Sequence, residues 1–553
     1  MVSFGQQSFL SNPGYQWQTQ QENGISCHYR GERSVANDIV KLISLENNAD
    51  KLTEKIEECL SGLKDYTSGV VETPELIVAW VDHIRSWPVY YSYDEDQIYI
   101  SNDARKVKEH AKLIQIDEAA AIEFAMSGYV TGKNTLYSSL FSLQPGEFLV
   151  WRKSDKKPLL KRYYRYIPDL KQKAEWTENQ QALGGILDSL THKIIERANG
   201  RTIWVPLSAG LDSRILLCKL HEHGYQRIKT FTYGPRYNFE AKHAKKIAER
   251  LSLPWQMIEL STKELRACFD DEQRKKFWDY ADGLKSIPCM REYSAIHALH
   301  KSGEVKEGDI FLNGQSGDYI TGGHIAPQLL RNGTSTADDF FNALIDKHYD
   351  LWSSLKTEDN IALMRERIAS LLPEGFENTK ANIDWATYAE MWEYDGRQVC
   401  YVVNGQRVYE FFGYDWEMPL WEKTLVDFCQ NLPLEQKAEQ ALYKSYLRDY
   451  NYKGLFPSKE PYIWRWPMPM LWVVPIARLI GVFAGAKAKR KFYDRMRYYG
   501  HYANQYVFFP LSDHKKTYKN ARNVISLHVR KWVWEEKSLF DANISKSLSI
   551  KEE

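Results

Sequence analysis

The chain has 553 residues, of which 43% are hydrophobic and 26% are charged, and its formal net charge at pH 7 is +1. This length predicts two or three domains, and this composition is typical of a globular protein and excludes a largely disordered one. The near-neutral charge argues against a protein that binds nucleic acid over its whole surface, so no nucleic-acid partner is expected.

Seven cysteines are scattered along the chain, and none belongs to a C-x-x-C pair. This spacing indicates reduced thiols rather than a disulfide framework or a zinc site. The first residues, MVSFGQQSFLSNPGYQW, are polar and lack the apolar run of a secretory signal. We therefore expect a cytoplasmic protein.

Residues 1–170 are expected to form one α+β domain built from short strands. The strand-like runs, each bounded by turn residues, are ELIVAWV (75–81), PVYYSY (88–93), QIYISN (97–102) and EFLVWR (147–152). Helical periodicity interrupts them at 50–63 and 116–128. The polar and charged segment 153–180 is interpreted as a linker to the next domain.

Between residues 171 and 465 helices first alternate with strands. The successive segments are QQALGGILDSLTHKIIERANG (180–200), RTIWVPL (201–207), SRILLCKLHEHG (213–224), KTFTYG (229–234), EAKHAKKIAERLSL (240–253) and QMIELS (256–261). This alternation predicts a parallel sheet covered by helices, and helices dominate after about residue 340. Residues 466–553 are expected to form a helical, basic extension.

The segment VPLSAGLDSR (205–214) joins an apolar strand to a helix, where backbone N–H groups and the helix dipole bind anions. Gly210 lets the backbone approach a phosphate, and the hydroxyls of Ser208 and Ser213 can donate to phosphate oxygens. Asp212 is a hard oxygen ligand suited to Mg²⁺. The lysine of a Walker A loop is absent. The alternative is a plain turn in which a Ser or Asp side chain caps the helix.

This segment resembles the pyrophosphate-binding loop (PP-loop) of the asparagine synthetase and β-lactam synthetase family, whose signature is S-G-G-x-D-S. Ala209 replaces the first glycine of that signature. The resemblance continues in family order through TFTYG (230–234), GDIFLNGQSGDYITGG (308–323), FGYDWEMPLWEKTLVDFCQNLP (412–433) and LYKSYLRDY (442–450). It implies an α/β fold: a PP-loop (adenine nucleotide α-hydrolase-like) parallel sheet with helical additions.

The resemblance also implies roles for individual residues. The nucleotide-binding residues that it implies are Ser208, Ala209, Gly210, Leu211, Ser213, Thr232, Tyr233, Gly234, Asn313 and Gly314. It places Mg²⁺-binding aspartates at Asp212 and Asp318, and it calls for a positive charge beside the phosphates, for which Lys444 and Arg465 are the candidates.

The positions of the two aspartates support a metal site independently of the resemblance. Asp212 and Asp318 lie 318 − 212 = 106 residues apart, each in a Gly-containing loop after an apolar strand. In a doubly wound sheet such loops converge at the carboxyl ends of the strands. A shared Mg²⁺ would neutralise charge on a departing pyrophosphate, although a turn is the commoner role for either aspartate alone.

The N-terminal domain resembles the glutaminase half of the same family. VAWVDHIRSWPVYYSYDEDQIYISNDARKV (78–107) matches the pattern D-x-x-R-x-x-P-L-Y-Y followed by S-S-D, and TGKNTLYSSLFSLQPGEFLVW (131–151) matches its T-L-F and P-G pattern. This implies an αββα sandwich of the Ntn-hydrolase type. The family's cysteine at the mature first position has no counterpart in MVSF, and Cys27 is interpreted as a packed thiol. Loss of glutamine hydrolysis is therefore expected.

The synthetase motifs depart from the family at two places. Gln315 stands where asparagine synthetases carry Glu, and an amide cannot act as a general base. Glu393 and Asp395 are candidates for that role, or else they lie on a solvated helix face. Pro467 occupies the position of the family's late lysine, which leaves Lys459, Arg465 or Lys444 to supply the positive charge, and arginine would bind phosphate in bidentate fashion.

An apolar stretch, MLWVVPIARLIGVFAGA (470–486), is interrupted by Pro475 and Arg478 and is shorter than the ~20 residues of a membrane-spanning helix. The basic residues that follow it are Lys487, Lys489, Arg490, Lys491, Arg495 and Arg497. Two interpretations remain open: a helix lying on an anionic membrane surface, or a core helix with a solvated basic end.

Together these patterns predict an ATP- and Mg²⁺-dependent synthetase that adenylates a carboxylate and transfers ammonia or an amine to it, releasing AMP and pyrophosphate. The nitrogen would come from free ammonia, an amine cosubstrate or a separate glutaminase. The wording L-S-A-G-L-D-S-R, N-G-x-S-G-D and G-G-H resembles bacterial asparagine synthase-like proteins of surface-polysaccharide assembly, which implies a small-molecule or glycan acceptor such as a uronic acid. The alternatives are an ammonia-dependent asparagine synthetase and a non-catalytic nucleotide-binding scaffold.

Overall fold

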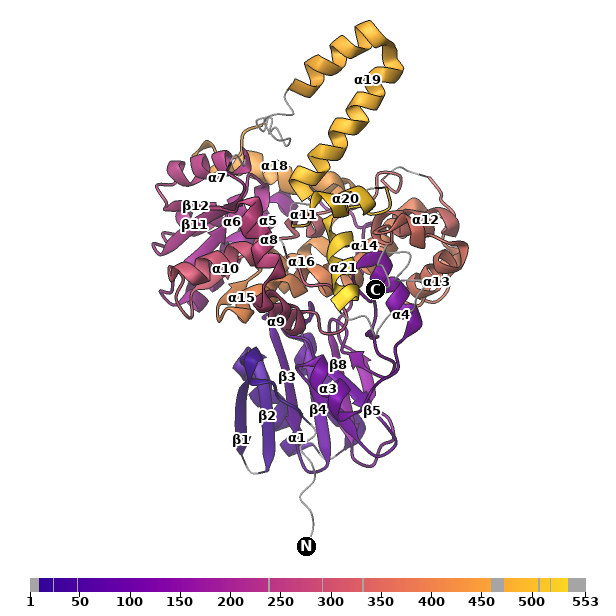
Figure 1. Ribbon diagram of the computed structural model, residues 1–553. Coiled ribbons are helices and arrows are strands. Elements are labelled where there is room, and N and C mark those ends of the chain that lie inside the picture. The colour runs from indigo at the N-terminus through magenta and orange to yellow at the C-terminus, as the bar shows by residue number, and fades with distance from the viewer. Residues whose placement is uncertain are drawn as a thin grey trace.

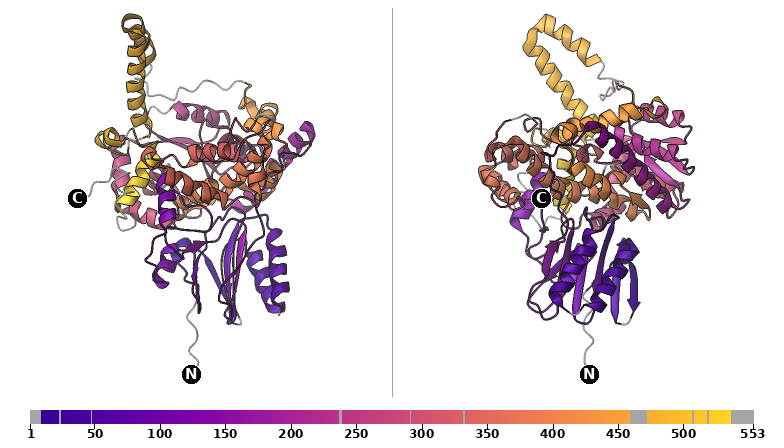
Figure 2. Two further views of the ribbon diagram at one scale, coloured as in Figure 1. Left: turned by 90° about the vertical axis from the view of Figure 1, so that its right-hand side faces the viewer. Right: turned by 180° about the vertical axis from the view of Figure 1, so that it is seen from behind.

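The computed structural model describes residues 9–22, 24–46, 48–236, 239–290, 292–330, 333–458, 472–505, 508–517 and 519–535. Figure 1 shows a β-rich N-terminal part stacked against a larger α/β part, and one helical segment, α19 (Val473–Gln505), projects away from both. Figure 2 shows the same projection from the side and from behind.

Two antiparallel sheets form the core of the N-terminal part. The larger sheet has the order β1 (Gln18–Glu22), β2 (Ile25–Gly31), β3 (Thr67–Glu72), β4 (Leu76–Val81), β8 (Glu147–Arg152) and β9 (Leu159–Arg162). The smaller sheet has the order β6 (Ile98–Ser101), β5 (Tyr90–Tyr93) and β7 (Phe141–Ser142). Helices α1 (Arg33–Leu45) and α2 (Ala49–Ser61) cover the larger sheet, and α3 (Ala104–His110) packs on the smaller one. The result is an αββα sandwich.

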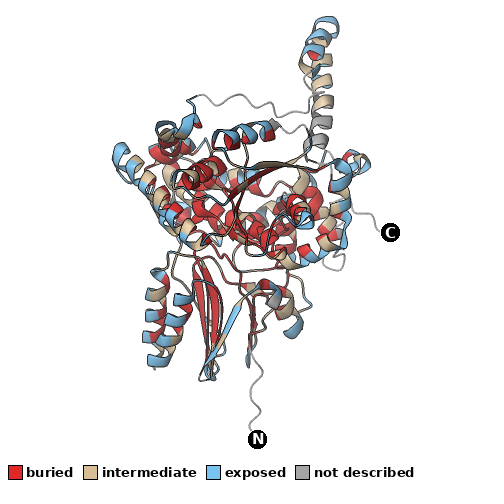
Figure 3. Cartoon of the chain, turned by 90° about the vertical axis from the view of Figure 1, so that its left-hand side faces the viewer, coloured by how far each residue is buried: buried red, intermediate tan, exposed pale blue. Residues whose placement is uncertain are grey.

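The strand β4 shows why its sequence forms the centre of this sandwich. Successive side chains of a strand point to opposite faces of the sheet. Val78 and Trp80 pack toward α1 and α2, whereas Ile77 and Ala79 pack between the two sheets. Because both faces are covered, the strand is apolar at every position and wholly buried. Figure 3 shows buried strands at the centre of this part and an exposed strand beside them.

The α/β part is built on a five-stranded sheet in which every pairing is parallel. Its order is β12 (Trp255–Glu259), β11 (Ile228–Gly234), β10 (Ile203–Pro206), β13 (Ile310–Leu312) and β14 (Asp415–Glu417). The chain builds outward from β10 to β12 and then returns to β13 on the other side of β10. Loops that follow β10 and β13 therefore meet at a topological switch point, the usual ligand-binding position of such sheets.

The helices of this part surround the sheet and extend it. They are α5 (Trp176–Ala198), α6 (Leu211–Glu222), α7 (Phe239–Arg250), α8 (Thr262–Asp270), α9 (Glu272–Ala281), α10 (Tyr293–Ser302), α11 (Gly317–Ile320), α12 (Ala337–His348), α13 (Glu358–Ala369), α14 (Asn382–Glu393), α15 (Arg407–Phe411), α16 (Lys423–Gln430), α17 (Leu434–Lys437), α18 (Ala441–Tyr450), α20 (Leu511–Thr517) and α21 (Val524–Glu535). A π-helical stretch, Tyr394–Val402, directly continues α14. No helix among the described residues is long and apolar enough to cross a bilayer.

One hydrophobic cluster spans both parts, in addition to the clusters on the two faces of the larger N-terminal sheet. Helix α4 (Glu118–Ser127), which precedes the parallel sheet in sequence, packs against α13 and α21. The ring of Phe124 lies 4.9 Å from that of Trp532, centroid to centroid, and both side chains are buried. The C-terminal helix α21 thus binds the N-terminal part to the α/β part.

The structure confirms the predicted strands and helices of both parts and the predicted parallel sheet. The interpretation of 153–180 as a linker is wrong, because Leu159–Arg162 forms β9 and pairs with β8. Tyr166 of the same segment is fully buried, and its ring stacks on that of Tyr394 at 4.5 Å. Most lysines of the segment face solvent, which explains why its polar composition hides a strand and a buried tyrosine.

Candidate active site

The loop that follows β10 has the geometry of an anion-binding turn. Ser208 accepts a hydrogen bond from the backbone N–H of Gly210, and its own N–H donates to the Ser213 hydroxyl at 3.2 Å. Helix α6 begins at Leu211, and no side chain of the described residues caps its first turn. Gly210 is exposed and Ala209 half-buried, so this turn and the start of α6 are open to a ligand.

The loop that follows β13 packs directly on this turn. A Cβ atom on Gly314 would lie 2.8 Å from the backbone nitrogen of Ser213, and one on Gly317 would lie 2.6 Å from the carboxyl carbon of Asp212. Only glycine fits at these two positions, because any side chain would displace the first turn of α6. The predicted convergence of two loops that lie about a hundred residues apart is therefore a direct backbone contact.

The Asp212 carboxylate faces a second carboxylate. The backbone N–H of Asp318 donates to Asp212, and the Tyr443 hydroxyl donates to its Oδ1 at 2.9 Å. Burial raises the pKa of Asp212, and the negative charge of Asp318 raises it further, to about 7. No ion pair joins Asp212 to a lysine, arginine or histidine of the described chain. The pair of carboxylates thus holds negative charge that a cation would neutralise.

Asp318 is exposed and is oriented by a histidine. His324 Nε2 lies 3.3 Å from Asp318 Oδ2, and His324 Nδ1 lies 2.6 Å from Glu393 Oε1. Burial lowers the pKa of His324, but the hydrogen bonds and charges of the two carboxylates outweigh it and raise the pKa to about 9. Partial loss of hydration in the crevice raises the pKa of Asp318, and the hydrogen bond and charge of His324 outweigh it and bring the pKa below its usual value.

The two acids proposed as substitute bases are both engaged elsewhere. Glu393 is buried and contacts His324 and Lys347, and Asp395 is buried and makes a bidentate ion pair with Arg162. The alternative of a solvated helix face is therefore wrong for both. Their helix lies between the N-terminal part and the loop after β13, so its charged face is covered on both sides.

Gln315 belongs to a buried polar network. Its amide donates to Glu292 Oε1 at 2.9 Å, and its backbone N–H donates to Asn313 Oδ1. Glu292 Oε2 also accepts a hydrogen bond from the Tyr409 hydroxyl. The carboxylate of Glu292 is thus hydrogen-bonded to the side chain at position 315, where the family carries a glutamate. The Asn313 side chain points into this network, where it lies 3.2 Å from Tyr409 Oη.

The remaining predicted residues lie around the same edge of the sheet. Thr232 donates its hydroxyl to the Leu207 carbonyl, and Tyr233 and Gly234 end the neighbouring strand β11. Lys444 follows Tyr443 on α18, is exposed, and donates to the Glu439 carbonyl at 2.7 Å. Arg465, with Lys459 and Pro467, lies outside the described residues.

The donor set fits a hard divalent cation. Asp212 and Asp318 offer carboxylate oxygens, the ligands that Mg²⁺ prefers, beside a helix N-terminus that would hold the phosphates of a shared ligand. A second carboxylate cluster, Asp188 with Glu222 and His223, does not offer the same open position, because the Lys219 ammonium already lies 2.7 Å from Asp188 and 3.0 Å from Glu222.

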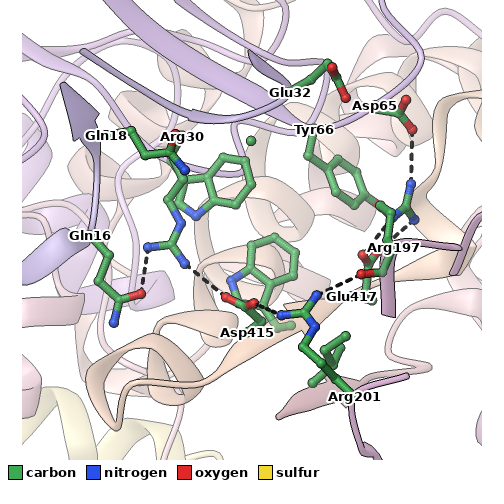
Figure 4. Close-up of a pocket in the computed structure, with 14 residues that line it drawn as sticks. Gln16, Gln18, Arg30, Glu32, Asp65, Tyr66, Arg197, Arg201, Asp415 and Glu417 are labelled. Atoms are coloured by element: carbon green, nitrogen blue, oxygen red, sulfur yellow. Dashed lines mark hydrogen bonds and ion pairs between the residues drawn. The ribbon is translucent and has the colours of Figure 1, made fainter. Parts of the chain in front are cut away.

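A separate cavity of about 490 Å³ lies between the two parts, toward the edge of the parallel sheet opposite Asp212 (Figure 4). Its arginines face carboxylates of the same cavity. Arg197 makes a bidentate pair with Glu417, and Arg201 pairs with Asp415. Arg30 Nη2 also lies within 4 Å of Asp415. This interdomain cavity therefore presents little unbalanced charge to a ligand.

Cys27 lies in β2 and is buried. Burial raises the pKa of its thiol to about 12, so it is protonated near neutral pH. All seven cysteines are free. These facts agree with the interpretation of Cys27 as a packed thiol.

Sequence reasoning missed Tyr443, His324 and Glu292 as neighbours of the site. Tyr443 lies in the quoted segment 442–450, where only the following lysine drew notice, and His324 ends the G-G-H wording. Either could have been found from its place within a motif. Glu292 lies outside every motif, and only the folded chain shows that it contacts Gln315.

Residues 198–459 match the family described as asparagine synthase. This stretch begins just before β10 and includes both loops of the site. The match supports an asparagine synthase-like domain over this stretch and, in general terms, ATP-dependent amide-forming chemistry. None of the curated protein sequences compared with the chain matches it.

Solved structures give only weak likenesses. A glutamine phosphoribosylpyrophosphate amidotransferase from B. subtilis, complexed with ADP and GMP, is 12% identical with a TM-score of 0.17, over 55% of this chain and 59% of that one. An allosteric regulatory enzyme of purine biosynthesis is 10% identical with a TM-score of 0.18, over 43% and 61%. An NH3-dependent NAD synthetase from Campylobacter jejuni is 11% identical with a TM-score of 0.20, over 37% and 97%. The chain thus spans about three fifths of the first two structures, and TM-scores this low carry no argument.

Proposed function

We propose that the chain is an AMP-forming carbon–nitrogen ligase that activates a carboxylate with ATP and passes the acyl group to ammonia or an amine. The observation that carries this proposal is the contact between the two loops, in which the Asp212 carboxylate rests on Gly317 and accepts the Asp318 N–H. That contact sets two metal-binding oxygens beside a free helix N-terminus.

In the first step an oxygen of the acceptor carboxylate attacks the α-phosphorus of ATP, and the bond from that phosphorus to the bridging oxygen breaks. The products are an acyl-adenylate and pyrophosphate. The N–H groups at the start of α6 and the hydroxyls of Ser208 and Ser213 would bind the departing pyrophosphate. Mg²⁺ held by Asp212 and Asp318 would neutralise its developing charge.

In the second step the nitrogen nucleophile attacks the carbonyl carbon, and AMP leaves with the electrons of the broken C–O bond. The nucleophile must lose a proton; the amide of Gln315 cannot accept it, so the proton would pass to the phosphate of the departing AMP or to water. Glu292, one hydrogen bond behind Gln315, is the nearest carboxylate of that loop's network. We therefore propose that Glu292 positions the Gln315 side chain so that it faces the incoming amine.

The nitrogen source is proposed to lie outside this chain's own N-terminal part. Cys27 is a buried, protonated thiol and offers no nucleophile for glutamine hydrolysis. Free ammonia, an amine cosubstrate or ammonia from a separate glutaminase would serve. For the acceptor we propose a uronic acid of a surface-glycan precursor, on the sequence resemblance alone.

The test is an assay of ATP-to-AMP conversion by purified protein with Mg²⁺, ammonium and a panel of acids that includes nucleotide-linked uronic acids and aspartate. We expect AMP to form in amounts equal to the amide, with Asp318→Asn inactive and Asp338→Asn active, because Asp338 is exposed in the first turn of α12 and pairs with Arg365 rather than with a residue of the crevice. Turnover with aspartate alone would identify an asparagine synthetase. Absence of AMP with every acid and amine, despite Mg²⁺-dependent ATP binding by calorimetry, would contradict the ligase and favour a nucleotide-binding scaffold.

A further inference from the structure

Helix α19 is a hairpin rather than one straight helix. Gly485 interrupts it with φ 81° and ψ 173°, values that lie far from helical geometry and that glycine adopts without strain. The two arms lie side by side near the turn, since a Cβ atom on Gly481 would lie 3.0 Å from the Lys489 side chain. Figures 1 and 2 show the hairpin projecting from the body of the protein. We call residues 472–491 the hairpin tip.

The first arm of the hairpin tip exposes large apolar side chains. The exposed fractions are 69% for Trp472, 42% for Ile476, 58% for Leu479, 78% for Val482 and 85% for Phe483. Half of the ten exposed large hydrophobic residues of the described chain thus fall within twelve consecutive positions. Such clustering marks an interaction surface, because single exposed apolar residues are ordinarily scattered. The interpretation of this stretch as a core helix is therefore wrong.

Basic residues adjoin this apolar arm. Lys487, Arg490 and Lys491 are exposed, and Lys489 is half-buried against the first arm. Residues 472–505 contain seven lysines and arginines and one aspartate, a net charge of 7 − 1 = +6 in a chain whose total is +1. Net positive charge is thus concentrated beside the densest run of exposed large apolar residues in the described chain.

We propose that the hairpin tip docks on the surface of an anionic lipid bilayer. Trp472, Leu479 and Phe483 would enter the boundary between headgroups and acyl chains, while the lysines and arginines contact anionic headgroups. The first arm, Val473 to Ala484, would be about 18 Å long as a helix, which is too short to cross a hydrocarbon core of about 30 Å. Docking on the surface is the arrangement that this length allows.

Charge selects the bilayer over a second copy of the chain as the occupant. A symmetric contact between two copies would bring two hairpin tips together, and each tip carries an excess of positive charge. The like charges would repel, whereas an anionic leaflet attracts every lysine and arginine of the tip. This inference does not depend on the proposed ligase activity.

The first experiment is cosedimentation of the full chain with vesicles of phosphatidylcholine alone or of phosphatidylcholine and phosphatidylglycerol at 7:3. We expect binding to the anionic vesicles and at least tenfold weaker binding to the neutral ones. The double variant Val482→Asp with Phe483→Asp should bind anionic vesicles at least about 30-fold more weakly. It removes apolar area that the bilayer would cover, and it adds negative charge. Ile114→Asp, which changes an apolar residue 89% exposed elsewhere, should bind as the unmodified chain does.

The second experiment replaces Lys487, Lys489, Arg490 and Lys491 with glutamine. Binding to anionic vesicles should fall on the order of 600-fold, since each of the four basic residues near an anionic surface contributes about fivefold, and the same binding should weaken with added salt. All these positions except Lys489 are exposed, so folding, checked by circular dichroism, should be unchanged.

Three results would overturn the proposal. One is no binding to either vesicle, and another is equal binding to neutral and anionic vesicles. The third is self-association of the unmodified chain in sedimentation velocity that the Val482→Asp and Phe483→Asp changes abolish, which would identify a second copy as the occupant.

Discussion

The interdomain cavity and the crevice between the loops after β10 and β13 are both lined by charged side chains. They differ in how these charges are paired. In the cavity Arg197 meets Glu417, and Arg201 meets Asp415. In the crevice Asp212 has no ion-pair partner among the described residues and faces Asp318, a second carboxylate, whose own partner is His324. Paired charges stabilise an interface, whereas like charges held together cost stability and persist where a ligand will neutralise them. The comparison teaches that charge balance, more than cavity volume, separates a structural site from a functional one.

The largest expected effect is on turnover. Asp318→Asn removes one charged metal ligand, and ATP-to-AMP conversion should fall on the order of 1,000-fold. Because Asp318 is exposed, the melting temperature should change little, which calorimetry would check. If Asp318→Asn keeps turnover within a few-fold of the unmodified chain, the crevice is not the catalytic site.

The matched change in the cavity should act on stability instead. Arg197→Met leaves Glu417 and Asp65 without their shared partner and should lower the free energy of unfolding by about 1–2 kcal/mol, a figure reduced for the partial exposure of Arg197. Denaturant titration would measure it. ATP binding should be unchanged, and a loss of turnover in the folded variant would show that the cavity takes part in the reaction.

Addition of Mg²⁺ should stabilise the protein through the crevice alone. At about ten times its dissociation constant a bound ion adds about 1.4 kcal/mol, which raises the melting temperature of a chain of this size by a few degrees. The rise should vanish in Asp318→Asn and persist in Arg197→Met. A rise of equal size in both variants would place the ion elsewhere.

Asp212→Asn should have an effect on stability opposite in sign to that of Arg197→Met. It removes the repulsion of two carboxylates, so the free energy of unfolding without Mg²⁺ should stay constant or increase by up to about 1 kcal/mol at pH 8. Denaturant curves of the two variants, measured side by side, provide the comparison. A clear loss of stability in Asp212→Asn would mean that its charge is compensated in the fold.

The smallest effect is expected for Tyr443→Phe. This change removes one hydrogen bond to Asp212 and should reduce kcat by about three- to tenfold, with folding intact. Tyr446→Phe, three residues along the same helix, is the control and should leave kcat unchanged. Equal losses in both variants would indicate a general disturbance of α18.

Much of the fold and part of the candidate site could be predicted from local pattern. The strands 75–81 and 147–152 are continuous apolar runs. The turn at 205–214 is made of consecutive residues, so its motif can be read directly from the sequence. The aspartate at 318 was found because it lies in its own glycine-rich motif. His324 and Glu292 were not predicted as neighbours of the site. Their contacts with Asp318 and Gln315 form only when the chain folds, and no local pattern records them.

The sequence by itself determined the sandwich strands, the alternation that makes a parallel sheet, and the turn between β10 and α6, because these depend on the periodicity and backbone chemistry of short segments. Only the tertiary structure decided that Asp212 rests on Gly317, that Glu393 and Asp395 are buried, and that Phe483 is exposed. Burial and pairing of a side chain depend on which distant segment covers it, and periodicity does not encode that partner. The same apolar helix is a core element or a membrane contact according to whether the body of the protein reaches it.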